Sequence, residues 1–225
     1  MRIAAITRPS APSLLAKVQS LIERTYAREA LDAAERFIIG DEGLRRLHGA
    51  RFIDDAGRPM LLVRFEGGAH HASVYFPDAL IANLEANDPG RGLCEANLHD
   101  FAAFVEEIDH LLAIVAAARR GRPVRAVELE IHANVTKVLV LSLFLARTLG
   151  TERLSAGQRD ELRFELLGRG DYASEEPHLR ERYRDARRHA LRFLARLDGT
   201  PAAQRPSLLR AFSSAPFSEK LKLCA

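Results

Sequence analysis

The chain has 225 residues, of which 47% are hydrophobic and 28% charged, and its formal net charge is +3. These proportions indicate a folded globular protein and exclude an intrinsically disordered one. The small net charge gives little support for a polyanionic partner of the whole chain. The two cysteines, Cys94 and Cys224, are too few for a disulfide framework and lack the spacing of a metal site.

The longest apolar run, residues 138–146, is too short to cross a bilayer, because a membrane-spanning helix needs about 20 residues. The first twenty residues contain no continuous apolar segment of the secretory type. We therefore expect a soluble cytoplasmic protein with reduced thiols and no membrane association. A homo-oligomer is compatible with the sequence.

The first third of the chain changes character from helical to extended. Residues 8–48 are rich in Ala, Leu, Arg and Glu, which predicts N-terminal helices with a break near Gly40 to Gly43. Residues 50–77 contain two β-type runs separated by Gly-containing turns, which predicts a small antiparallel β-meander. A short helix is expected after Pro77.

Residues 97–150 predict a central helical hairpin. Asn97 and Asp100 have the spacing of an N-terminal cap, and apolar residues follow at helical intervals. A turn at residues 121–123 leads to a second element that ends at Gly150. The start of that element is ambiguous, because residues 127–132 alternate between apolar and polar like a half-buried strand. Its length favours a helix, and Pro123 suits a first helical turn.

Residues 177–198 predict an amphipathic basic helix, with Gly199 and Pro201 marking its end. The Leu and Phe residues of the tail that follows indicate that it docks on the rest of the chain. The whole chain then forms a single domain, residues 1–225. Its fold class is mainly α: a helical bundle with a small β-meander inserted near residues 50–77.

Two polar clusters interrupt the apolar helices of the hairpin. The first helix carries Glu106, Glu107, Asp109 and His110, and the second carries Glu128, Glu130, His132, Asn134 and Lys137. A hairpin with its midpoint at the turn places His110 opposite Asn134, Glu107 near Lys137 and Glu128 opposite Ala116. Glu106 and His110, like Glu128 and His132, are four residues apart, so each pair lies on one helical face.

One interpretation of these clusters is a divalent metal site between the two helices. Carboxylates and imidazoles are ligands for Zn²⁺ and Fe²⁺, and helical bundles hold metals through facing side chains. The candidate ligands are Glu107, His110, Glu130 and His132. In an enzyme of this kind we expect metal-assisted hydrolysis, with Glu106 as the general base.

A second interpretation is a buried ion-pair network without metal. Lys137 precedes a wholly apolar stretch, and an unpaired buried charge is unfavourable, so this lysine needs a carboxylate partner. Glu106 or Glu107 is within reach by register, and Glu130 and Asn134 lie on the stripe of Lys137. A third interpretation is that both clusters are ordinary solvated faces.

The C-terminal region suggests a different class of function. From Arg180 onward the chain has eleven Arg or Lys against four Asp or Glu. The candidate anion-binding residues are Arg184, Arg187, Arg188 and Arg192. They predict a non-catalytic interaction or adaptor protein that binds an acidic protein or nucleic acid without sequence specificity. Alternatively, Glu161, Glu165, Glu175 and Glu176 neutralise these arginines.

Overall fold

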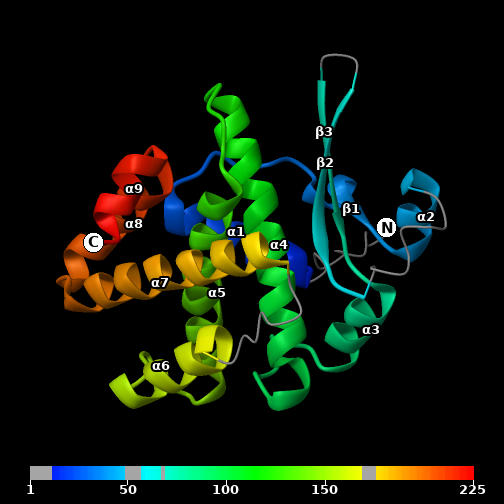
Figure 1. Cartoon of the computed structure of the whole chain (residues 1–225). Coiled ribbons are helices and arrows are strands. Elements are labelled where there is room, and N and C mark those ends of the chain that lie inside the picture. The colour runs from blue at the N-terminus through cyan, green and yellow to red at the C-terminus, as the bar shows by residue number, and fades with distance from the viewer. Residues whose placement is uncertain (1–11, 49–56, 67–68, 169–175) are drawn as a thin grey trace, which may run out of the picture.

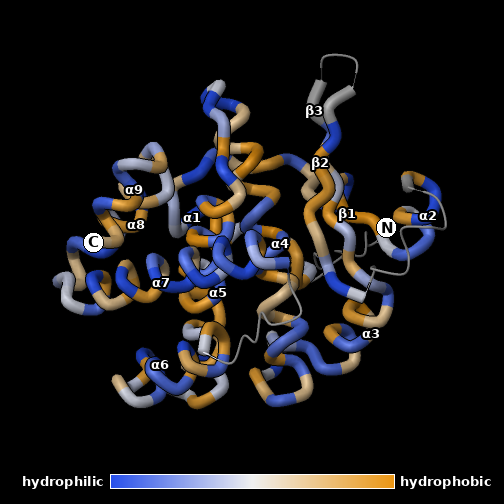
Figure 2. Tube along the Cα trace, viewed as in Figure 1, coloured by the Kyte–Doolittle hydropathy of each residue, from blue (hydrophilic) through white to orange (hydrophobic). Residues whose placement is uncertain are grey.

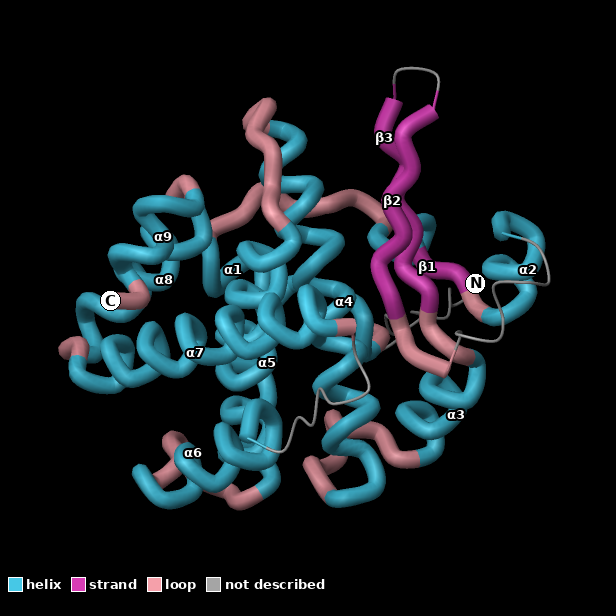
Figure 3. The backbone as a smooth tube through the Cα atoms, in the orientation of Figure 1, coloured by secondary structure: helices cyan, strands magenta, loops and turns pink. Residues whose placement is uncertain are grey.

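A hairpin of two long helices, α4 (Glu95–Arg119) and α5 (Ala126–Thr148), forms the centre of the computed structural model. The structure describes residues 12–48, 57–66, 69–168 and 176–225. Helix α7 (Pro177–Gly199) runs across α5, and both α4 and α7 pack extensively on it (Figure 1). The mainly α fold with a small β insertion is confirmed, as the secondary structure in Figure 3 shows.

Helix α4 begins two residues earlier than the sequence predicts. Cys94 is the residue that precedes the helix, and Asn97 lies inside the first turn. The side-chain oxygen of Asn97 accepts the N–H of Cys94 at 2.9 Å. Its amide donates to the carbonyls of Asn87 and Gly92, at 3.0 and 2.9 Å. Asn97 therefore fastens the preceding loop onto the start of α4. Phe101, Val105 and Ile108 then fill the core at helical spacing.

Helix α5 is continuous from Ala126, so the ambiguous residues 127–132 are helical and not extended. The helix starts after Arg125, and Pro123 lies in the loop before it. Residues 131–138 are all buried, and Figure 2 shows apolar residues along the length of α5. In the described part of the chain, α5 is also long and apolar enough to span a membrane, but 61% of its most apolar window is buried inside the fold.

The sheet is mixed, which corrects the predicted antiparallel meander. β2 (Met60–Glu66) and β3 (Ala69–Tyr75) form the expected antiparallel hairpin. The third strand is β1 (Ile38–Ile39), which pairs in parallel with β3 and lies in a stretch predicted as helix. Two β-branched residues suffice for strand pairing here, because Val74 and Tyr75 offer a free edge. Residues 50–56 of the expected meander lie outside the described ranges.

The N-terminal region combines helix with other structure. Helix α1 (Leu14–Tyr26) begins at Ser13, whose hydroxyl accepts the N–H of Ala16 at 3.1 Å, and it packs on α4, α5 and α8. A 3₁₀ turn (Ala34–Phe37) precedes β1, and α2 (Asp41–His48) follows it. Residues 8–11 of the predicted helical region are not among those described. Helix α2 covers the sheet face formed by Met60, Leu62 and Tyr75, while the opposite face meets the helical body.

The remaining helices cover the ends of the hairpin. Helix α3 (Asp78–Ala86) packs on α4, and α6 (Ala156–Arg163) continues into a π-helical turn (Phe164–Gly168) against α5. A 3₁₀ turn (Ala202–Gln204) leads into α8 (Arg205–Ser214), which is followed by α9 (Phe217–Leu223). Phe212, Lys220 and Cys224 are buried, so this tail docks on the core as the sequence indicates.

Candidate metal centre

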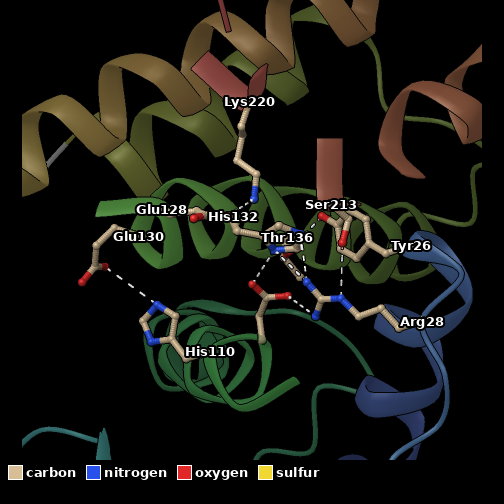
Figure 4. A network of polar contacts seen from close by, with 10 residues as sticks. Tyr26, Arg28, His110, Glu128, Glu130, His132, Thr136, Ser213 and Lys220 are labelled. Carbon is tan, nitrogen blue, oxygen red and sulfur yellow. Dashed lines mark hydrogen bonds and ion pairs between the residues drawn. The ribbon is translucent and has the colours of Figure 1, made fainter. Parts of the chain in front are cut away.

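Three of the predicted site residues meet between α4 and α5. Glu106 and His110 lie one turn apart on α4, and Glu130 extends toward them from α5. One ligand atom from each residue lies within 4.8 Å of the other two. Figure 4 shows His110 and Glu130 pointing toward one another across the gap between the helices. Helical spacing on α4 and the packing of α5 on it together create this group.

The imidazole of His110 is buried, with 8% of the residue exposed. Its Nδ1 lies 3.5 Å from a carboxylate oxygen of Glu107, and its Nε2 lies 3.9 Å from one of Glu130. Among the described residues, neither His110 Nε2 nor Glu107 Oε2 has a hydrogen-bond partner. Such buried orphan atoms are uncommon in proteins and often mark an ion or water site.

Burial and neighbouring charges shift the titration of this group in different directions. Burial lowers the pKa of His110, but Glu107, Glu130 and Glu106 outweigh it and raise that pKa to about 9. Burial raises the pKa of Glu130 above its usual range. Burial also raises the pKa of Glu106, but the Lys137 ammonium outweighs burial and lowers the pKa of that carboxyl. Without a metal, His110 therefore carries a proton at neutral pH.

Two cations border the group. Lys137 Nζ donates to Glu106 Oε2 at 2.5 Å, as the sequence interpretation of a buried ion pair requires. Arg182 of α7 lies 3.7 Å from Glu130. Asn134 is buried on α5, but no side-chain hydrogen bond joins it to Glu106, His110 or Glu130 in the described structure. The same group of side chains thus contains an ion pair, Lys137 with Glu106, and three residues of the types that bind metal ions.

Metal binding requires a small contraction of the group. Zinc binds nitrogen and oxygen at about 2.0–2.1 Å with tetrahedral angles, which places ligand atoms about 3.3 Å apart. The ligand atoms here are up to 4.8 Å apart, so each has to move by about 1 Å. Glutamate side chains can move this far by rotation about their own bonds. One oxygen of Glu106 can remain on Lys137 while the other faces the ion.

His132, the fourth predicted ligand, belongs to a different cluster. Its Nδ1 lies 2.7 Å from Asp109 Oδ2, and its Nε2 lies 3.0 Å from Arg28 Nη2. Because the arginine only donates, Nε2 accepts and the proton resides on Nδ1, which donates to Asp109. Burial lowers the pKa of His132 to about 4, with Asp109 opposing and Arg28 reinforcing this shift. His132 is therefore neutral and held by its neighbours (Figure 4).

The cluster around His132 joins four helices. Tyr26 of α1 and Thr136 of α5 share a hydrogen bond of 2.8 Å, and Thr136 lies 3.3 Å from His132 Nδ1. Arg28, just after α1, contacts Asp109 of α4 at 3.4 Å and donates to Ser213 of α8 at 3.3 Å. Although burial raises the pKa of Asp109, His132 and Arg28 outweigh it and lower that pKa to about 2.

Glu128 is also separate from the candidate metal centre. Lys220 of α9 and Arg122 of the hairpin loop both donate to its Oε1, at 2.9 and 2.8 Å. Lys220 and Glu128 are each 2% exposed. Glu128 thus anchors the C-terminal tail. The predicted register placed it opposite Ala116 and did not predict these contacts.

The basic face of α7 is only partly neutralised. Arg188 pairs with Asp185 on the same helix at 2.9 Å. Arg184 and Arg192 are exposed and Arg187 is half-buried, and in the part of the chain that the structure describes none of the three forms an ion pair. Glu161 and Glu176 therefore do not neutralise them, and Glu175 lies outside the described residues.

Sequence reasoning missed Arg28 and Ser213 and assigned no role to Asp109. Asp109 stands beside the predicted residues on α4, but its spacing from His110 directs it to another side of the helix. Arg28 and Ser213 lie 81 and 104 positions from Asp109, with nothing in the local pattern to connect them. Comparisons of this chain with family models, curated proteins and solved structures found no significant match.

Proposed function

We propose that this protein binds one divalent transition metal ion, Zn²⁺ or Fe²⁺, between α4 and α5 through Glu106, His110 and Glu130. The observation that carries the proposal is the convergence of three ligand atoms around a buried imidazole nitrogen that has no hydrogen bond. A metal at that nitrogen would satisfy it. Three protein ligands also leave at least one position for water, as catalytic zinc sites do.

Metal binding competes with the proton on His110 and with the two neighbouring cations. The ion requires a neutral imidazole, so binding releases a proton and tightens as the pH rises. Lys137 and Arg182 repel the incoming cation. Replacing Lys137 with Met should therefore tighten metal binding, whereas a group that serves only as an ion-pair network would show no metal binding in either form.

Titration of metal-free, untagged protein with Zn²⁺ and with anaerobic Fe²⁺ tests the proposal. We expect one equivalent to bind, with at least tenfold weaker binding in the His110→Ala and Glu130→Gln variants. His178→Ala is the matched control, because His178 is an exposed histidine on α7 whose side chain is 72% accessible. Less than about a tenth of an equivalent after loading would overturn the proposal.

Metal-assisted hydrolysis is the reaction class that we propose for the loaded protein. Glu106 is the most exposed carboxylate of the group, at 26% for its side chain against 12% for Glu130, so an entering water meets it first. With Lys137 keeping it ionised, Glu106 would give up its contact with the ion to the entering water and accept a proton from that water through the freed oxygen, as a general base. Activated phosphodiester and carboxylic ester substrates are suitable probes. Equal rates for loaded wild type and loaded Glu106→Gln would rule out this role.

A second candidate function rests on the unpaired arginines of α7. Arg184, Arg187 and Arg192 are not neutralised by any described residue, which favours an anionic partner over a closed surface network. Their side chains are long, always charged and suited to phosphate or carboxylate. The adaptor function predicted from the sequence, with an acidic protein or non-specific nucleic acid as partner, would use this face.

Anisotropy titrations with a short random duplex and a single strand at two salt concentrations test this second function. Each neutralised phosphate contributes a slope of about −0.9 in log K against log salt on duplex DNA. If Arg184, Arg187 and Arg192 each neutralise a phosphate, removing all three should make the slope less negative by about 2 to 3. Absence of binding at low salt would exclude nucleic acid and leave an acidic protein as the partner to seek.

A further inference from the structure

A cleft of about 710 Å³ lies along the β-hairpin, bordered by α2 and by the C-terminal end of α4, away from the candidate metal centre. Its walls come from the loop after α1, the 3₁₀ turn, α2, both strands of the β-hairpin and the C-terminal end of α4. Sites for small organic ligands in proteins occupy about 300–1,000 Å³. The cleft is therefore large enough for a molecule of ordinary metabolite size.

Part of the wall of this cleft is apolar. Leu31 and Phe37 line one side, and Leu62 and Val63, which point to opposite faces of β2, line two others. Val63 is 49% exposed and Leu47, at the rim on α2, is 46% exposed. Few large apolar side chains are this exposed elsewhere in the described structure. An apolar ligand would remove these surfaces from water, which stabilises a complex.

Positive charge borders the apolar wall. Arg36, Arg64 and Arg119 line the cleft, Asp32 is the one carboxylate among its described lining residues, and His71 lies beside them. The Arg119 guanidinium donates to the carbonyls of Glu29 and Ala30, each at 3.1 Å, and lies 3.5 Å from the exposed carboxylate of Glu29, which partly neutralises it. Arg36 is exposed and forms no ion pair or side-chain hydrogen bond with the described residues.

The cleft and the candidate metal centre lie on opposite sides of α4. Arg119 follows His110 by nine residues, which at 100° per residue is two and a half turns. The same nine residues separate them by about 13 Å along the helix axis. A ligand in the cleft and an ion between α4 and α5 therefore contact different side chains. The two sites can be tested independently.

We propose that this cleft binds a small organic anion with an apolar body, such as an alkyl or aryl carboxylate. The apolar wall around Phe37 and Val63 would take the body of the ligand. The anionic group would lie at the arginines, where Arg36 has no ion pair with the described residues and Arg119 is held by main-chain carbonyls. Charge-assisted hydrogen bonds to guanidinium would then fix the orientation of the ligand in the cleft.

Fluorescence titration with 1-anilinonaphthalene-8-sulfonate, an aryl anion, tests the proposal on the full-length protein. We expect saturable binding of one equivalent, which decanoate displaces and decanol at the same concentration does not. Equal displacement by decanoate and decanol would overturn the assignment of an anion. No saturable binding, or binding unaffected by the cleft variants below, would overturn the site.

Variants locate the probe. Arg36→Gln should weaken binding about fivefold to tenfold, since it removes one charge-assisted contact. Arg91→Gln is its matched control, because Arg91 is exposed and does not line the cleft. Ala72→Phe fills the cleft, and Leu47→Asp, at an exposed position, adds repulsion without disturbing the core. Combined Arg184→Gln and Arg192→Gln should leave binding unchanged, and a loss there would place the probe on α7.

Discussion

The pairing of Lys137 with Glu106 is the feature of the site that the sequence predicts most directly. A lysine in an apolar helix needs a carboxylate, and hairpin register brought Glu106 or Glu107 within reach. The structure selects Glu106, at 2.5 Å. It leaves Glu107 beside His110 instead, because consecutive residues on α4 point in directions about 100° apart.

Removing the two members of this pair should have unequal effects on stability. Glu106→Gln leaves a lysine that is 10% exposed without its carboxylate, whereas Lys137→Met leaves a carboxylate that is 26% exposed and reaches solvent. We expect a loss of about 2–3 kcal/mol for Glu106→Gln and about 1 kcal/mol for Lys137→Met. Urea unfolding in the presence of a chelator measures both.

The double variant provides the control for this comparison. If the charges interact as the structure shows, Glu106→Gln with Lys137→Met should be close in stability to Lys137→Met alone. Additive losses would mean that the two side chains do not interact in solution. Glu107→Gln, which removes a neighbouring carboxylate that does not contact Lys137, should not couple to Lys137→Met in the same way.

At the scale of elements, the long periodic helices could be predicted and the pairing between distant ones could not. The apolar spacing of α4, α5 and α7 indicates their faces, and their ends differ from prediction by a few residues. The partner of His110 is different: it meets Glu130 and not Asn134. The loop of residues 120–125 keeps the predicted midpoint, so Glu130 reaches His110 through its long side chain from one turn earlier on α5.

Helix α8 is anchored by one aromatic side chain, a contact that the sequence pattern does not specify. Phe212 is fully buried and stacks on Phe193 of α7, with ring centroids 4.0 Å apart, and on His132 at 5.4 Å. Lys220 of α9 lies over the same ring. The docking of the tail therefore depends on the ring as well as on its hydrogen bonds.

Phe212→Ala should reduce stability by about 3–5 kcal/mol, since it removes a buried ring and leaves a cavity between α5, α7 and α8. Thermal melts and urea unfolding measure the loss. Phe217→Ala is the control, because Phe217 is only partly buried, and a smaller loss is expected there. Limited proteolysis should cut the tail of the Phe212 variant first. Equal losses for the two variants would show that the stacking contributes nothing specific.

For the whole molecule, two histidines set the pH range of stability. His132 has a pKa of about 4 in the folded protein, below its unfolded value of about 6.5, so its contribution is complete above pH 6.5 and is lost as the pH falls toward 4. Asp109, with a pKa of about 2, extends the loss at still lower pH. His110 has a folded pKa of about 9, so its contribution is complete below pH 6.5 and is lost as the pH rises toward 9.

We therefore expect the metal-free protein to be most stable near pH 6.5, with a decline on each side. The histidine contributions are at most about 3 kcal/mol each. Urea unfolding from pH 4 to pH 9 in the presence of a chelator measures the profile. His110→Gln should flatten the alkaline side alone, with His178→Gln as a control that changes neither side. A profile without an alkaline decline in the wild type would contradict the raised pKa.

The cluster of Tyr26, Arg28, Asp109, His132 and Ser213 has a kinetic consequence. The contacts of Arg28 with Asp109, His132 and Ser213 span 81 to 185 positions of the chain, so they can form only after long loops have closed. We expect interactions of this kind to form late in folding, so that losing one acts mainly on the rate of unfolding. Tyr26→Phe, which deletes the hydroxyl bonded to Thr136, should cost about 1 kcal/mol. In stopped-flow experiments that loss should speed unfolding about fivefold and leave refolding unchanged.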